Sequence, residues 1–170
     1  MQESLYKALV NKSVQLYFGI NTSASPASYH PESKGITFAN TESITSASLK
    51  EELFHAWQDA YYPGGISQYA ETGIVNIEFE AKVFKDLIMQ MGTYSAFFKT
   101  ETDEEKRINS EYGNWIESVK EDISILQDRS VYNYWLDLFN EYNPAYTSPI
   151  SNQLTGFDSL NNIISSSNCF

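Results

Sequence analysis

The sequence predicts an α+β fold that is mainly helical and carries a small sheet. Apolar residues recur at helical spacing in several stretches, from 2–11 near the start to 131–142 near the end. Between Val14 and Ile20 they instead alternate with other residues, which is the period of a strand. The chain has 170 residues, of which 42% are hydrophobic, so we expect a single domain over 1–170 with a core of its own.

The N-terminal part of the chain is expected to hold one short helix and two strands. Apolar residues gather on one side of 2–11 and predict the helix. The strands are expected over 13–20 and 35–40. A polar loop rich in Ser, Ala and Pro should join them from 21 to 34.

The stretch Leu49–Gln58 is predicted to be a helix, because apolar residues recur along it at helical spacing. Ser46 or Ser48 is expected to cap its N-terminus. Ser48 followed by Glu51 three positions later has the pattern of a capping box. The sequence Pro63–Gly65 cannot continue a helix and should end it.

Helices are also expected over 74–91, 102–126 and 131–142, with a shorter one over 157–164. We interpret their Tyr, Trp and Phe stripes as core, so the part from about 101 to 165 should be helical. The residues expected to face the core are Ile77, Ala81, Phe84, Ile88 and Met91 in the first helix, Ile108, Tyr112, Trp115, Val119, Ile123 and Leu126 in the second, and Val131, Tyr134, Trp135, Leu138 and Phe139 in the third.

Three polar residues of the 49–58 helix form a candidate site. Glu51 and His55 are four residues apart, so their side chains should lie on one face, one turn from each other. A carboxylate and an imidazole at that separation can coordinate one metal ion. Glu52 is adjacent in the sequence and could position a water molecule bound to that ion.

The segment Glu51–His55 resembles the zinc-binding helix of the zincin metallopeptidases, whose motif is His-Glu-x-x-His. The tail Ala56–Gln58 also resembles the continuation of such helices. The resemblance implies that His55 is the second metal ligand and Glu52 the general base. It also implies that Glu51 takes the place of the first histidine ligand.

Further along, Glu78–Ala81 resembles the second helix of the gluzincin branch, which supplies the third ligand. Glu78 is the matching position and Glu80 the alternative. Acidic residues are also common in the first turn of any helix, where the helix dipole favours them. The resemblance covers a motif region of about 35–90. The order of strand, loop, strand and motif helix, counted from residue 13, also fits the upper part of a zincin.

Replacing one imidazole by Glu51 changes the expected metal chemistry. The ligand set becomes one imidazole and two carboxylates, which neutralise a divalent metal and lower its Lewis acidity. Mn²⁺, Mg²⁺ and Ca²⁺ then compete better with Zn²⁺. We expect a divalent metal or none, zinc if any, and little zinc in the purified protein. His30, the only other histidine, could complete a site, although Tyr-His-Pro more often marks a surface turn.

Three functions follow from these patterns. The favoured one is a zincin-like, metallopeptidase-related domain with an altered metal site, catalytically inactive or of changed metal preference. The second is an active peptidase in which Glu51, His55 and Glu78 bind the metal and Glu52 deprotonates water. The third is a non-enzymatic helical interaction domain, in which Glu51 caps its helix and His55 is buried.

Charge and composition exclude some partners. The net charge of −11 argues against nucleic acids and anionic membranes, which attract clustered Lys and Arg. No stretch approaches the roughly 18 apolar residues of a membrane span. A peptide or protein partner is compatible with the sequence. The single cysteine, Cys169, permits no internal disulfide, and the compartment and oligomeric state are left open.

Overall fold

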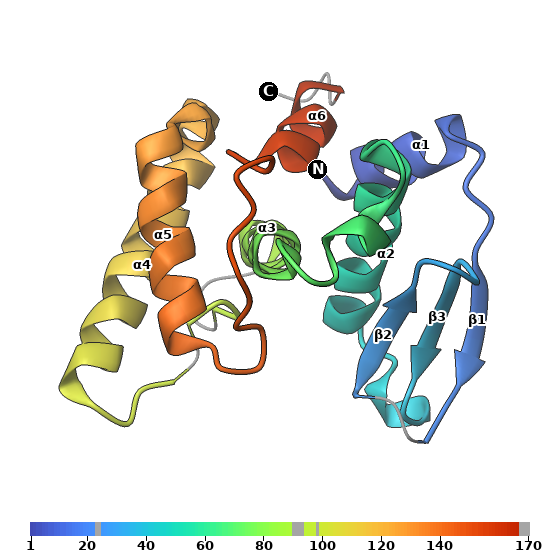
Figure 1. The fold of residues 1–170 in the computed structure, drawn as a ribbon, viewed down its shortest axis with the longest axis horizontal. Coiled ribbons are helices and arrows are strands. Elements are labelled where there is room, and N and C mark those ends of the chain that lie inside the picture. Colours follow the sequence, from blue (N-terminus) through green and yellow to red (C-terminus); the bar gives the residue numbers. More distant parts are fainter. Residues whose placement is uncertain (23–24, 90–93, 98, 167–170) are drawn as a thin grey trace. The chain divides into compact units, whose positions relative to one another are not determined.

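The computed structural model describes residues 1–22, 25–89, 94–97 and 99–166. It has the predicted α+β architecture, mainly helical with one small sheet (Figure 1). The long elements are α1 (Gln2–Asn11), β1 (Tyr17–Ile20), β2 (Ala27–His30), β3 (Gly35–Phe38), α2 (Ser46–Tyr61), α3 (Ile74–Ile88), α4 (Asp103–Glu121), α5 (Arg129–Tyr142) and α6 (Asp158–Ser166). The short 3₁₀ turns are η1 (Thr41–Ser43), η2 (Ile66–Tyr69) and η3 (Ile123–Gln127).

The chain forms two compact units, and their boundaries along the chain fall within η2 and within α6. Residues 1–68 and the end of α6 make up the first unit, and residues 69–161 make up the second. The single domain expected from the chain length stays a prediction. Within the described residues, no helix is both long enough and apolar enough to cross a bilayer.

The first unit combines the sheet with α1 and α2. Its strands lie in the order β1-β3-β2, with β1 parallel and β2 antiparallel to β3. The α2 helix contacts β2 and α1. Ile36 and Phe38 of β3 are completely or almost completely buried and anchor the sheet in the core.

Three details of the sheet differ from expectation. The strand expected over 35–40 ends at Phe38, because Asn40 already caps η1. The first strand begins at Tyr17 and not at residue 13, because the C-terminal cap of α1 extends beyond that helix. Ser13 there has a φ of 54°, and the Val14 N–H donates to the Leu9 carbonyl at 3.0 Å. The 21–34 stretch is also not entirely a loop, because Ala27–His30 forms β2.

The second unit is a helical bundle around α3. The α3 helix contacts α4 and α5, and Phe79 lies at the centre of the packing. Its ring centroid lies 5.3 Å from that of Phe139, 5.6 Å from that of Phe157 and 5.9 Å from that of Tyr132. Of the aromatic residues predicted to face the core, Phe84, Tyr112, Trp135 and Phe139 are buried.

The bounds of these helices differ in part from the prediction. The α3 helix ends at Ile88, because Met89 is extended, and residues 90–91 of the expected helix lie outside the described part. The α4 helix ends at Glu121 and not at 126, because the Asp122 side chain accepts from the Ser124 N–H at 3.0 Å and caps η3. Tyr134, expected in the core, is 48% exposed, and Tyr132 is buried in its place.

Candidate metal centre

The start of α2 removes the capping role considered for Glu51. Thr45 is the N-cap, and it forms a reciprocal capping box with Ser48. The predicted capping box of Ser48 with Glu51 is therefore wrong. Because the helix begins at Ser46, Glu51 lies beyond its first turn, where backbone N–H groups already have partners within the helix.

The polar candidates on α2 are buried. Glu51 and Glu52 are each 7% exposed and His55 is 6% exposed. Burying charged side chains is costly unless they are paired, hydrogen-bonded or bound to a metal. The helix therefore buries three polar side chains at positions where apolar side chains would serve packing alone at a lower cost.

Gln58 orients the imidazole of His55. The His55 Nδ1 lies 2.9 Å from Gln58 Oε1, one turn further along the same helix, and Gln58 is fully buried. Since an amide oxygen only accepts, Nδ1 carries the proton in this pairing, and the lone pair is on Nε2. Histidine ligands in metal proteins commonly donate their second ring N–H in this way.

The α3 helix is held at its N-terminus by the segment from Ser148 to Leu154. The N–H of the N-cap residue Gly73 donates to the Pro149 carbonyl at 2.8 Å. The buried Asn76 amide accepts from the Ser151 N–H at 3.0 Å and donates to the Leu154 carbonyl at 3.0 Å. These bonds position the first turns of α3, which carry Glu78.

Glu80, the alternative third ligand, has a different role. Its Oε1 accepts from the Leu160 N–H at 2.9 Å, and its Oε2 accepts from the Ser159 hydroxyl at 2.7 Å. A carboxylate at the N-terminus of α6 is favoured by the helix dipole and satisfies orphan N–H groups. Glu80 is 2% exposed, so this is a buried structural contact. Burial raises the pKa of the Tyr132 phenol, and the nearby Glu80 carboxylate raises it further.

Two of the predicted ligands share one face of α2. Glu51 and His55 lie one turn apart on this helix, and both are buried. A carboxylate and an imidazole at this spacing can bind one metal ion. Glu78 lies on α3 in the second unit and is partly buried. His30 is exposed on β2, where its Nε2 lies 2.8 Å from Thr37 Oγ1.

Sequence reasoning missed a polar network at the far end of α2. The buried Asp59 carboxylate accepts from the Tyr29 hydroxyl and from the Ile66 N–H, and it forms an ion pair with Lys34. Burial, followed by the hydrogen bond to Asp59, raises the pKa of Tyr29. The signal available in the sequence was the position of Asp59, four residues after His55 and therefore one turn along the same face.

On α2, His55 offers one nitrogen ligand and Glu51 one carboxylate ligand, and the adjacent Glu52 carboxylate is also buried. Imidazole with carboxylates is a donor set for divalent transition metals and for harder cations. The chain matches no family model, no curated protein and no solved structure.

Proposed function

We propose that this protein is a divalent-cation-binding domain of zincin-like design, in which Glu51, His55 and Glu78 are the ligands. The observation that carries the proposal is the burial of Glu51 and His55 one turn apart on α2, where Gln58 holds the imidazole. The resemblance of α2 to a zinc helix supports these two ligands from the sequence, and the resemblance of Glu78–Ala81 to the second helix of the gluzincin branch supports Glu78.

The residues present fit a cation. Two carboxylates and one imidazole would balance the charge of a divalent ion. Gln58 holds the His55 ring with the proton on Nδ1, which leaves Nε2 as the ligating nitrogen. When bound, the cation would supply Lewis acidity, at a level lowered by its two carboxylate ligands.

The same charge balance favours a binding or regulatory role over peptide hydrolysis. Glu52 occupies the position of the general base, but a base assists hydrolysis only if a strongly acidified water is presented to it. We therefore propose an altered metal preference, with Mn²⁺ competing well against Zn²⁺, and no appreciable peptidase activity. An active peptidase is the alternative that the experiment below tests.

The test is calorimetric titration of metal-free protein with Mn²⁺ and with Zn²⁺, comparing the wild type with His55→Ala and Glu78→Gln. The matched controls are His30→Ala and Glu71→Gln, which change exposed residues that are not among the proposed ligands. We expect one site per chain, an affinity loss of roughly tenfold or more in the first two variants, and no loss in the controls.

Two results would overturn the proposal. One is the absence of a stoichiometric site in the folded wild type. The other is an unchanged affinity in either His55→Ala or Glu78→Gln, with circular dichroism confirming that the variant is folded. Hydrolysis of an unstructured protein substrate that disappears in Glu52→Gln would instead support the active peptidase.

A further inference from the structure

The strand β1 has an open edge. Within the described part of the chain it pairs only with β3, on one side. The Tyr17 N–H donates to the Lys34 carbonyl at 3.1 Å and the Asn21 N–H donates to the Phe38 carbonyl at 2.8 Å, so this set of alternate residues faces β3. Since successive residues of a strand direct their backbone groups to opposite sides, Phe18 and Ile20 direct theirs to the open edge.

The two residues at this edge also carry exposed apolar side chains. Phe18 is opposite Ile36 and Ile20 is opposite Phe38 in the parallel register, so all four lie on one face of the sheet. Ile36 and Phe38 are 0% and 2% exposed, whereas Phe18 and Ile20 are 60% and 52% exposed. On this apolar face of the sheet, the side chains of β3 are thus buried, whereas those of β1 are exposed to solvent.

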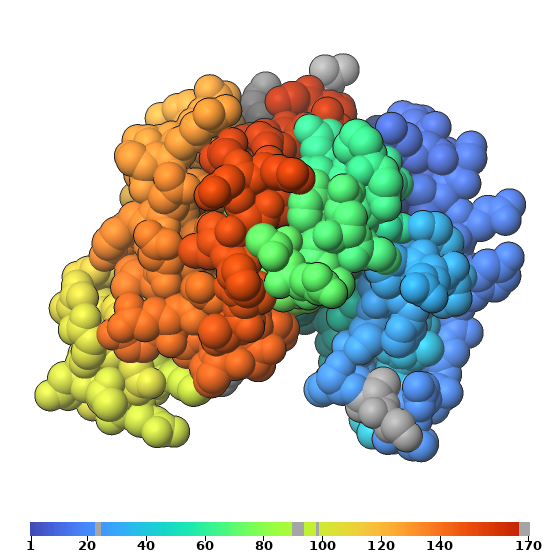
Figure 2. Space-filling view, in the orientation of Figure 1, coloured from blue at the N-terminus to red at the C-terminus, as the bar shows by residue number. Residues whose placement is uncertain are grey.

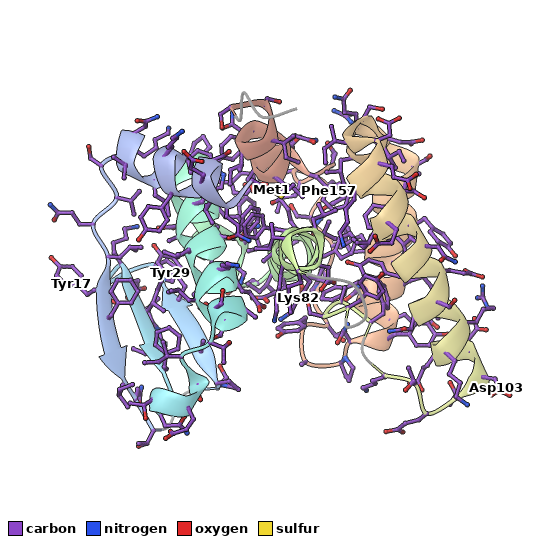
Figure 3. The ribbon with its side chains drawn as sticks, turned by 180° about the vertical axis from the view of Figure 1, so that it is seen from behind. Met1, Tyr17, Tyr29, Lys82, Asp103 and Phe157 are labelled. Carbon is purple, nitrogen blue, oxygen red and sulfur yellow. The ribbon has the colours of Figure 1, made fainter. Side chains whose placement is uncertain are left out.

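More apolar surface of the first unit is exposed nearby in the sequence. Tyr6 and Val10 lie one turn apart on α1 and are 65% and 67% exposed. Tyr17 of β1 is 67% exposed. Tyr17 projects away from the sheet (Figure 3), and dark-blue side chains of this N-terminal part project outward in the space-filling view (Figure 2). By contrast, the other edge strand, β2, is contacted by α2.

The charge distribution indicates which partner fits this edge. The chain carries a net charge of −11, yet residues 4–31 contain no Asp or Glu and include Lys7 and Lys12. Two copies of so acidic a chain repel each other over most of their surface, and this segment is where that repulsion is least. An antiparallel pairing of β1 with β1 is also self-complementary, as a two-fold interface requires.

We propose that β1 is a homodimerisation edge, at which the Phe18 and Ile20 backbone groups of two copies pair antiparallel and join two three-stranded sheets into one. The pairing covers the Phe18 and Ile20 side chains of both copies with each other. This proposal is independent of the metal centre, because none of the proposed ligands lies on β1.

The test is sedimentation equilibrium of the full chain over a concentration series, comparing the wild type with Ile20→Lys. A lysine at an edge strand opposes pairing. Tyr134→Lys is the control, because it places the same charge on an exposed aromatic position of the second unit. We expect a monomer–dimer equilibrium, weakened at least tenfold by Ile20→Lys and unchanged by the control.

Amide hydrogen exchange provides a second measurement. A nonspecific contact between apolar side chains would not slow the exchange of backbone N–H groups, whereas strand pairing would. The exchange of the Phe18 and Ile20 N–H groups should slow as the wild-type concentration rises, while Ile20→Lys removes this dependence. A wild type that stays monomeric, a dimer insensitive to Ile20→Lys, or exchange at these two amides that is independent of concentration would each overturn the proposal.

Discussion

Thr45 and Ser48 cap each other at the start of α2: the Thr45 hydroxyl accepts from the Ser48 N–H at 3.0 Å, and the Ser48 hydroxyl accepts from the Thr45 N–H at 3.0 Å. We predict that Thr45→Ala lowers the free energy of unfolding by about 1 kcal/mol, because the N-cap acceptor is lost. Urea denaturation measures the free energy of unfolding, and Thr41→Ala, in the preceding 3₁₀ turn, is the control. An equal loss in both variants would mean that the cap contributes nothing specific.

The substitution Glu51→His tests whether Glu51 occupies a ligand position. It completes the His-Glu-x-x-His motif, with two imidazoles about 6 Å apart along the helix axis. We expect zinc affinity to rise roughly tenfold or more, since imidazole suits Zn²⁺ better than a second carboxylate does. Zinc titration of both folded proteins is the measurement, and Glu71→His is the control. Unchanged affinity would exclude Glu51 as a ligand.

Gln58 is predicted to act on the metal through His55. Replacing Gln58 by Leu removes the acceptor for the His55 Nδ1–H, and affinity for the cation should fall by about 10- to 100-fold. Gln58→Glu retains an acceptor and should preserve binding. Nitrogen-15 chemical shifts of the imidazole should report protonation at Nδ1 in the wild type and in Gln58→Glu but a mixture of tautomers in Gln58→Leu. One tautomer in all three proteins would refute this role.

Gly65 and Gly64 have similar backbones but different surroundings. Both have positive φ values, 77° and 87°. A Cβ at Gly65 would overlap the Asp59 carboxylate, whereas one at Gly64 would lie 3.4 Å from the Gln68 side-chain amide, which is an ordinary van der Waals distance. Gly65→Ala should therefore destabilise the protein by about 1–2 kcal/mol more than Gly64→Ala. Thermal denaturation of the two variants makes the comparison, and equal losses would contradict it.

Asp128 should make stability depend on pH. Its carboxylate caps α5, and hydrogen bonds from the Ser130 hydroxyl and N–H lower its pKa. Because the folded pKa lies below the unfolded one, the stabilisation is present above the unfolded value of about 3.8 and is lost as pH falls through the folded pKa.

The comparison for Asp128 is with Asp128→Asn, which keeps a capping side chain but cannot ionise. The wild type should melt at a higher temperature than this variant at about pH 6, and the gap should close towards about pH 2. A gap that is the same at both pH values would show that ionisation of Asp128 does not stabilise the fold.

Local patterns were sufficient for much of the helical structure. The bounds of α1 were predicted, and Glu51 and His55 lie on one helix, because helical periodicity is a property of neighbouring residues. The start of α2 shows where such patterns stop being decisive. Two capping boxes compete there, and the chain adopts the one that begins at Thr45, directly after η1.

Contacts between distant residues decided the rest. The four residues of β2 have no strong pattern of their own and become a strand by pairing with β3. Glu78 and Glu80 were both candidate ligands in the local sequence, yet Glu80 is hydrogen-bonded to the N-terminus of α6, where Ser159 lies 79 residues further along the chain. Spacing within one helix sets which residues share a face, but only packing sets what that face meets, because the partner groups come from elsewhere in the chain.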